Sequence, residues 1–169
     1  MELAGLKARA MATVDACADE LIELSLRIHA HPEVAFEESQ ACGWLTSWLG
    51  ERGFKTATGL GGLPTAFLAV AGQGQPVVAI IAEYDALPGI GHGCGHNIIA
   101  TAAVGAGAAV RSVLEDLPGT VQVIGTPAEE VYGGKAIMIR EGAFEGLDAA
   151  MMTHPGSRDS VFATALACA

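Results

Sequence analysis

Five side chains that are able to bind a metal ion follow the predicted ends of three strands. Cys94 and His96 come after a buried apolar strand, Glu129 and Glu130 follow the next one, and His154 follows a third. Because the carboxyl ends of parallel strands meet at one edge of an open α/β sheet, we expect these side chains to share a rim. Thiolate, imidazole and carboxylate are ligands of zinc and related divalent metals. The sequence therefore predicts a metal centre at this rim.

The spacing within this set suggests different roles for its members. Cys94 and His96 are two residues apart, so in an extended segment they project the same way and can reach one metal centre. A thiolate can bridge two ions, whereas imidazole and carboxylate occupy terminal positions. Glu129 and Glu130 are adjacent and point in different directions, so one can bind metal while the other holds a water as general base. A helix beginning near Asn97 is expected to favour the thiolate of Cys94, because its positive end lies beside the sulfur.

Two further polar residues near these motifs have alternative interpretations. Asp85 either orients a metal-bound imidazole, the usual outer arrangement at such sites, or is an ordinary turn aspartate. His92 does not easily share the geometry of Cys94, which favours a supporting or substrate-facing role over direct metal binding. Gly93 and Gly95 permit the tight backbone that exposes the neighbouring ligands.

Other classes of function remain open on the same residues. Cys94 with a nearby histidine could serve as nucleophile and base of a cysteine hydrolase, although the Glu129–Glu130 pair has no task in that scheme. The chain could also be an inactive fragment or pseudoenzyme that binds metal weakly or acts only as a partner chain. The zinc deaminase pattern is excluded, because no Cys-x-x-Cys follows a His-x-Glu.

The elements that must position these residues alternate between helix and strand. Apolar spacing predicts one helix from about residue 4 to 29 and a second from 38 to about 52. The apolar runs 77–82 and 149–153 predict buried strands. The other expected strands are 65–70, 120–124 and 161–168, and the other expected helices are 97–114 and 134–142. This order indicates right-handed crossovers and a three-layer α/β fold with a mostly parallel sheet flanked by helices.

Composition limits the class of partner. Of the 169 residues 51% are hydrophobic, which is typical of a packed domain, and the formal net charge is −10. No nucleic-acid partner is expected, because such binders concentrate Lys and Arg on one face. The N-terminus lacks a signal-peptide pattern and the uncharged stretch 98–110 is too short to span a membrane, so no membrane partner is expected. Four cysteines without framework spacing favour a reduced, cytoplasmic protein.

The motifs resemble one known family. Residues 82–89 (Ala-Glu-Tyr-Asp-Ala-Leu-Pro-Gly), 92–97 (His-Gly-Cys-Gly-His-Asn), 125–130 (Gly-Thr-Pro-Ala-Glu-Glu) and 153–155 (Thr-His-Pro) are similar to motifs of the M20 metallopeptidase family. The resemblance is to its amidohydrolase branch, subfamily D, and within it to the aminobenzoyl-glutamate hydrolase subunit and the M20 domain-containing protein 2 type dipeptidases. It covers nearly the whole chain, including the His-Pro-Glu and Phe-Glu-Glu runs between residues 31 and 38.

The resemblance implies a reaction and a set of roles. Members of the branch hydrolyse the amide bond of dipeptides or N-acyl (aminobenzoyl-type) amino acids with two divalent ions, Zn or Mn, and an activated water. By similarity, Cys94 is the bridging thiolate, and His96, Glu130 and His154 are further ligands. Glu129 is then the carboxylate that activates the water and delivers a proton to the leaving amine.

The resemblance also implies that residues 1–169 are the N-terminal portion of a Zn-peptidase-like catalytic domain. Family members are longer, and after the strand at 161–168 they carry a lid and dimerisation domain with a substrate-binding histidine. They then complete the sheet and supply a last ligand histidine. Since both histidines are missing here, we expect the fragment alone to be inactive and the full-length protein to be a homodimer. Glu83-Tyr84-Asp85 stands where other M20 branches have His-x-Asp, consistent with the amidohydrolase branch.

Overall fold

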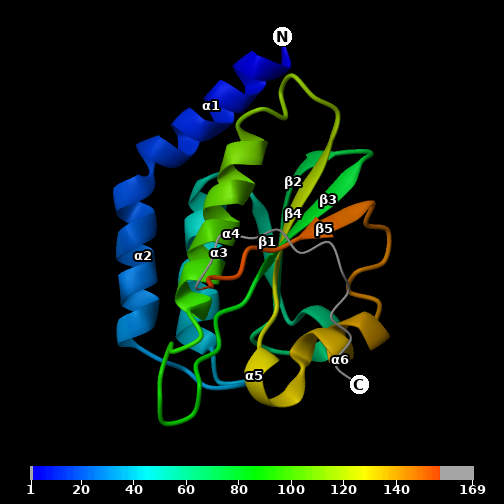
Figure 1. Cartoon of the computed structure of the whole chain (residues 1–169). Coiled ribbons are helices and arrows are strands. Elements are labelled where there is room, and N and C mark those ends of the chain that lie inside the picture. Colours follow the sequence, from blue (N-terminus) through cyan, green and yellow to red (C-terminus); the bar gives the residue numbers. More distant parts are fainter. Residues whose placement is uncertain (1, 157–169) are drawn as a thin grey trace.

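The computed structural model describes residues 2–156, which form an α/β fold around one five-stranded sheet (Figure 1). The expected strand at 161–168 lies outside the described residues. The elements, in chain order, are α1 (Leu3–Ala16), α2 (Ala18–Ala30), α3 (Ser39–Glu51), β1 (Lys55–Thr58), η1 (Leu60–Gly62), β2 (Phe67–Gln73), β3 (Val77–Ala82), α4 (His96–Arg111), β4 (Gly119–Gly125), α5 (Glu129–Tyr132), α6 (Gly134–Arg140) and β5 (Ala149–Met151).

The sheet is mixed, with the strand order β1-β2-β4-β3-β5. Strand β3 pairs in parallel with β4 and β5, as expected for strands that carry the candidate ligands at their ends. Strand β2 runs antiparallel to both β1 and β4, so the prediction of a mostly parallel sheet holds for only one half of it. The reason is the link between β2 and β3: residues 74–76 are too few for a crossover, which needs a dozen residues or more, so the chain must reverse.

Helices cover both faces of the sheet, which confirms the α/β architecture. Helices α1 to α4 lie together on one side, while α6 lies on the other (Figure 1). Alternate residues of β4 serve the two sides: Val123 joins the larger core under α3 and α4, and Ile124 joins a smaller core with Met138 of α6. This period of two is what a strand buried on both faces requires.

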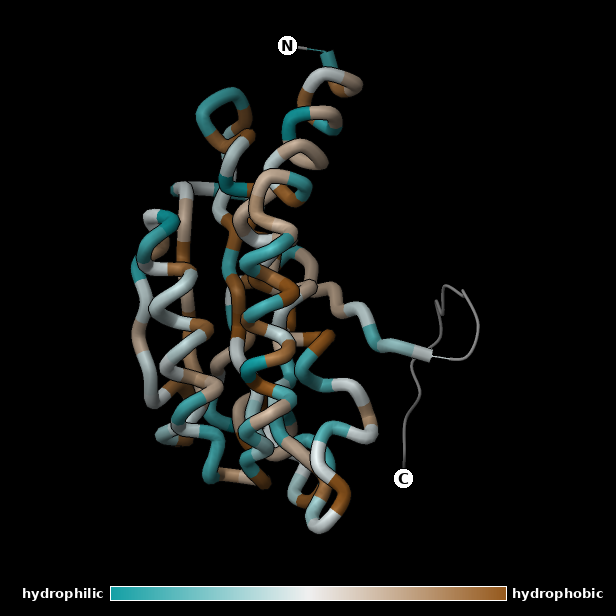
Figure 2. Tube along the Cα trace, turned by 90° about the vertical axis from the view of Figure 1, so that its left-hand side faces the viewer, coloured by the Kyte–Doolittle hydropathy of each residue, from teal (hydrophilic) through white to brown (hydrophobic). Residues whose placement is uncertain are grey.

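The N-terminal helix predicted from residue 4 to 29 is in fact two helices. It breaks at Cys17, whose backbone leaves the helical region at φ −111° and ψ 14°. Both α1 and α2 pack on α4, and the break lets the chain change direction between the two contacts (Figure 1). No Gly or Pro marks this position, so the sequence offers no signal for it. Figure 2, which faces the side of the helices, shows hydrophilic and hydrophobic residues alternating along their turns.

Two strands differ from expectation. Strand β1 has the residues Lys-Thr-Ala-Thr, all exposed, and its lack of apolar alternation explains why no strand is predicted there. Strand β5 was expected to be buried, but Ala149, Ala150 and Met151 are all exposed. The cause is its position: among residues 2–156 it pairs only with β3 and forms one edge of the sheet.

Candidate metal centre

The three parallel strands bring the predicted ligands to one edge of the sheet. Strand β3 leads into the loop that ends with Cys94 and His96, β4 leads into α5 with Glu129 and Glu130, and β5 leads to His154. The carboxyl ends of these strands coincide, because Ala82 of β3 pairs with Gly125 of β4 and Ile80 pairs with Met151 of β5. The five side chains therefore meet where parallel-sheet proteins bind their ligands.

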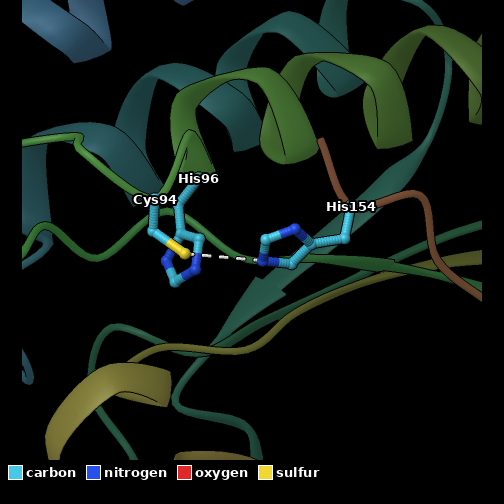
Figure 3. A group of neighbouring side chains, drawn as sticks. All are labelled: Cys94, His96 and His154. Carbon is cyan, nitrogen blue, oxygen red and sulfur yellow. Dashed lines mark hydrogen bonds between the residues drawn. The ribbon is translucent and has the colours of Figure 1, made fainter. Parts of the chain in front are cut away.

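One group of candidate ligands consists of Cys94, His96 and His154, shown in Figure 3. Their ligand atoms lie within 4.8 Å of one another, and Sγ of Cys94 is 3.5 Å from Nε2 of His154. Atoms bound to a common zinc ion at about 2.0–2.3 Å lie no more than about 4.5 Å apart. The Nδ1 atom of His154 contacts the carbonyl of Pro155 at 2.8 Å, which leaves Nε2 to face the cysteine.

A second group consists of His96, Glu129 and Glu130, whose ligand atoms also lie within 4.8 Å of one another. Nε2 of His96 is 3.5 Å from Oε1 of Glu130. The two glutamates differ in environment, since the side chain of Glu130 is 18% exposed and that of Glu129 is 40% exposed. His96 belongs to both groups, so it joins the cysteine side of the centre to the glutamate side.

Cys94 and His96 converge by a different route from the one predicted. The segment is not extended: Gly95 has a left-handed backbone (φ 82°, ψ 24°) and is the N-cap of α4, and His96 is the first residue of that helix. A residue with a Cβ rarely adopts this conformation, so glycine is needed between the two ligands. Gly93 has no positive φ, so only one of the two glycines has the conformational role that the sequence suggested.

Asp85 contacts the ring nitrogen of His96 that does not face Glu130. Its Oδ1 atom is 3.0 Å from Nδ1 of His96, and both side chains are fully buried. Its Oδ2 atom accepts a hydrogen bond from the backbone amide of Glu130 at 3.0 Å. Because Nδ1–H of His96 donates a hydrogen bond to Asp85, the lone pair of the neutral ring is on Nε2, the atom that faces Glu130. This is the contact that an imidazole-orienting role requires, and an ordinary turn aspartate would not need it.

The charges around His96 shift both partners of this pair. Burial opposes the protonated form of His96, but the hydrogen bond to Asp85 and the nearby charges of Glu83 and Glu130 outweigh it and raise its pKa above the usual value. Burial would likewise raise the pKa of Asp85, yet the hydrogen bonds from His96 and from the Glu130 amide bring it below its usual value. Asp85 therefore stays ionised and keeps its negative charge beside the ring of His96.

Three buried polar atoms at this point have no hydrogen-bond partner among the described residues. They are Nε2 of His96, Oε1 of Glu130 and Oε2 of Glu83, and the last is 3.4 Å from the first. Leaving such an atom unsatisfied costs about 1–3 kcal/mol. A divalent cation would satisfy a lone pair of the imidazole and the charge of the carboxylates together. The donor set of nitrogen, oxygen and a thiol suits zinc or a related transition metal, so the residues fit the ion that the sequence predicts.

The thiol of Cys94 is not activated by its surroundings, contrary to the expectation from the helix dipole. Burial together with the hydrogen bond and negative charge of Glu130, and the charges of Glu129 and Glu83, raises its pKa to about 11. Each of these groups raises the pKa of the thiol, and none of them lowers it. A cation bound at the centre would favour the thiolate of Cys94 near neutral pH.

Glu83 and Lys135 are part of the site but were not among the predicted site residues. The Glu83 side chain is 2% exposed; its Oε1 atom accepts a hydrogen bond from Lys135, while Oε2 faces His96. The Lys135 ammonium is also 4.0 Å from Oε1 of Glu129. Glu83 lies within the motif 82–89, directly after β3, so its place at the strand end was a usable signal. Lys135 lies on α6 and had none.

His92 is buried at 8% exposure, and neither of its ring nitrogens has a hydrogen-bond partner among the described residues. Its ring lies against that of His29, with the centroids 6.2 Å apart. Burial, with the nearby charges of His29 and His96, lowers its pKa. His92 is in neither candidate ligand group, and in this structure it does not face solvent.

Residues 79–165 match the family described as Peptidase family M20/M25/M40, and the chain belongs to that family. It is 42% identical to the Xaa-Arg dipeptidase of Mus musculus over 95% of this chain and 41% of that protein. It is 39% identical to one of the subunits of the p-aminobenzoyl-glutamate hydrolase of Escherichia coli K12, over 89% of this chain and 35% of that one. The chain thus spans less than half the length of these curated relatives.

The fold is shared with a solved structure of the same family. The YxeP protein of Bacillus subtilis, described as a dinuclear metal binding peptidase from the M20 family, matches with a TM-score of 0.73 and 28% identity. The match covers 80% of this chain and 42% of that one. In the part of the chain that the structure describes, no helix is both long and apolar enough to cross a membrane.

Proposed function

We propose that this chain contributes the metal-binding part of a hydrolase that cleaves the amide bond of dipeptides or N-acyl (aminobenzoyl-type) amino acids. The observation that carries the proposal is the convergence of two overlapping ligand groups on His96. Around its Nε2 lie buried atoms that have no hydrogen-bond partner within residues 2–156. In the proposal Cys94, His96, Glu130 and His154 hold two divalent ions, Zn or Mn. Such ions supply Lewis-acid activation of the amide carbonyl and of the attacking water.

The environments of the two glutamates support different roles for them. Glu130 is the more buried, and its position is fixed because its backbone amide donates to Asp85. A fixed carboxylate suits a metal ligand when one of its oxygens lies beside His96 without a hydrogen-bond partner in the described part of the chain. Glu129 is more open and lies near the Lys135 ammonium, so its carboxylate can take a proton from a water and return it to the nitrogen of the leaving amine. In the same proposal Asp85 keeps the lone pair of His96 on Nε2.

The substrate class comes from the relatives and is proposed, not observed. The Xaa-Arg dipeptidase and the aminobenzoyl-glutamate hydrolase each act, by name, on an amide that joins an acyl or aminoacyl group to an amino acid. Since this chain covers less than half of either relative, residues elsewhere in a complete enzyme would bind part of the substrate. The homodimer, the division of domains and the cytoplasmic location stay predictions.

A cysteine hydrolase is the second candidate, because the 3.5 Å contact between Cys94 and His154 has the geometry of a nucleophile and its base. The high pKa of the Cys94 thiol argues against it, since a nucleophilic cysteine needs a lowered pKa. The carboxylates that help to raise this pKa would have no function in such an enzyme. The metal proposal uses both features, because a cation removes the thiol proton and pairs with the carboxylates.

The test uses the complete gene product, loaded with Zn or Mn and assayed on p-aminobenzoyl-glutamate and on a dipeptide that ends in arginine. We expect about two ions per chain, hydrolysis of at least one substrate, loss of activity with a chelator and recovery when metal returns. Activity that ignores the chelator, with a covalent adduct on Cys94 during turnover, would establish the cysteine hydrolase instead. Failure to retain any ion after loading would refute the metal centre itself.

A further inference from the structure

Glu38 is a fully buried carboxylate that the proposed chemistry does not use. It is 0% exposed, and among the described residues it has no Lys, Arg or His within ion-pair distance. Burial raises its pKa, because its hydrogen bonds do not fully compensate for the lost water. A buried charge-bearing side chain is rare unless it is satisfied in a specific way, so its partners indicate what it is for.

The partners of Glu38 come from three separate segments. Its Oε1 atom accepts hydrogen bonds from the backbone amides of Phe36, at 3.0 Å, and of Ala128, at 2.9 Å. Its Oε2 atom accepts the hydroxyl of Thr65 at 2.8 Å. The contact with Ala128 joins residues 90 positions apart in the sequence. Glu38 thus ties the start of α3 to the residue that directly precedes Glu129.

Ala128, in the turn between β4 and α5, has a strained backbone. It has a left-handed backbone (φ 58°, ψ 40°), which disfavours any residue with a Cβ. It is the N-cap of α5, and its carbonyl accepts the amide of Gly134 at 3.0 Å, closing the turn that contains Glu129 and Glu130. The direction in which both glutamates leave the strand depends on this one conformation, and the Glu38 carboxylate holds its amide.

The segment 33–38 also contacts the loop after β3, which carries Glu83 and Asp85. The carbonyl of Glu33 accepts the amide of Ala86 at 2.8 Å, and Val34 forms a parallel bridge with Ala86, the residue after Asp85. At its other end the ring of Phe36 stacks on Tyr132 of α5, with centroids 5.2 Å apart and planes 28° apart. One short segment therefore packs against both loops that supply acidic groups to His96.

We propose that Glu38 is a positioning residue of the metal centre: its carboxylate fixes the Ala128 turn, and through it the placement of Glu129 and Glu130 against His96. The inference rests on the proposed function for its effect on activity. Its structural part, the dependence of the turn on Glu38, can be measured whether or not the chain takes part in amide hydrolysis.

The test compares four variants of the complete gene product. Glu38→Ala removes the acceptor of the Ala128 amide, whereas Glu38→Gln keeps an amide oxygen in its place. Thr65→Val removes a buried hydrogen bond of Glu38 without touching Ala128, and so controls for loss of stability alone. Glu37→Gln changes the exposed neighbour of Glu38 and controls for charge. All are assayed at a temperature where circular dichroism shows them fully folded.

We expect Glu38→Ala to lower kcat about 10- to 100-fold with KM nearly unchanged. A displacement of a reacting group by about 1 Å or less has an effect of this size. Amide hydrogen exchange of residues 128–132 should become faster in that variant and in none of the others. Glu38→Gln, Thr65→Val and Glu37→Gln should stay within about threefold of the parent kcat, because the Ala128 amide keeps an acceptor in each.

The outcomes separate the two proposals. If the parent protein hydrolyses no amide with metal bound, the proposed function fails, and the exchange rates at 128–132 still decide the role of Glu38. If the parent is active and Glu38→Ala changes neither kcat nor those exchange rates, or changes them no more than Thr65→Val does, Glu38 is only a structural residue and the inference is overturned.

Discussion

The clearest prediction concerns the reactivity of Cys94 in the metal-free protein. Burial, together with carboxylates on two neighbouring loops, raises the pKa of this thiol from 9.0 to about 11. At neutral pH the thiolate fraction is therefore about 100-fold smaller than for an unperturbed cysteine. A more basic thiolate is also a better nucleophile: with a Brønsted coefficient of about 0.5 it gains about tenfold, so attack on a disulfide reagent should be about tenfold slower overall.

The assay is reaction of the metal-free protein with an aromatic disulfide reagent, followed by absorbance, with mass spectrometry to assign the modified cysteine. Cys17 and Cys42 are buried free thiols, so Cys94→Ser provides the background rate. The pH dependence is the sharper readout, because the rate at Cys94 should keep rising about tenfold per pH unit beyond pH 9, where an ordinary thiol levels off. Loading with zinc should block the reaction.

A plateau below pH 8 would refute this reasoning. It would mean that Cys94 is a thiolate without metal, stabilised by His154 or by the start of α4 against the carboxylates. The cysteine hydrolase would then become the better hypothesis, since its nucleophile would already be formed. The same measurement therefore decides between the two candidate functions without any substrate.

Two further predictions follow from the roles of the acidic groups. Glu129→Gln should keep its metal ions, by elemental analysis, and lower kcat by about 10²- to 10⁴-fold, whereas Glu130→Gln should lower metal occupancy; the opposite pattern would reverse their assignment. In the metal-free protein the pKa of His96 is higher in the folded state than in the unfolded state, so protonation of His96 stabilises the fold. This stabilisation is fully present below the unfolded-state pKa and is lost as the pH rises through the folded-state pKa. The urea midpoint should therefore fall as pH increases above about 6.5, and Asp85→Asn should remove much of this slope; a slope unchanged in that variant would show that the pair is not its source.

The parts of the fold that the sequence predicted are those with strong local signals. Strand β3 has the predicted bounds, because six consecutive apolar residues leave no other assignment, and α3 differs from its prediction by one residue at each end. The break at Cys17 had no such signal, since the change of direction depends on packing against α4, which is distant in sequence. Strand β1 was missed because it packs no apolar side chain into the core.

At the site, residue types were predictable and environments were not. Motif spacing identified Cys94, His96 and His154, which the structure brings within bonding reach of one ion. The state of the Cys94 thiol was predicted in the wrong direction, because it depends on burial and on carboxylates that come from other loops. Lys135 and Glu38 were not identified for the same reason: each acts through a contact more than 50 positions away.

The place of β4 in the sheet has a consequence for how the chain folds as it is synthesised. Strands β2 and β3 are consecutive in the sequence, yet β4 lies between them. Until residue 125 has left the ribosome, β3 therefore has no paired neighbour and β2 has only β1. Before then only β1 and β2 can pair with each other, and the backbone groups on both edges of the apolar strand β3 have no partner strand. Such a chain relies on late, long-range pairing, which is slow and exposes it to aggregation. Nascent chains that stop before residue 119 should therefore bind chaperones strongly, and chains that extend past β4 should escape them.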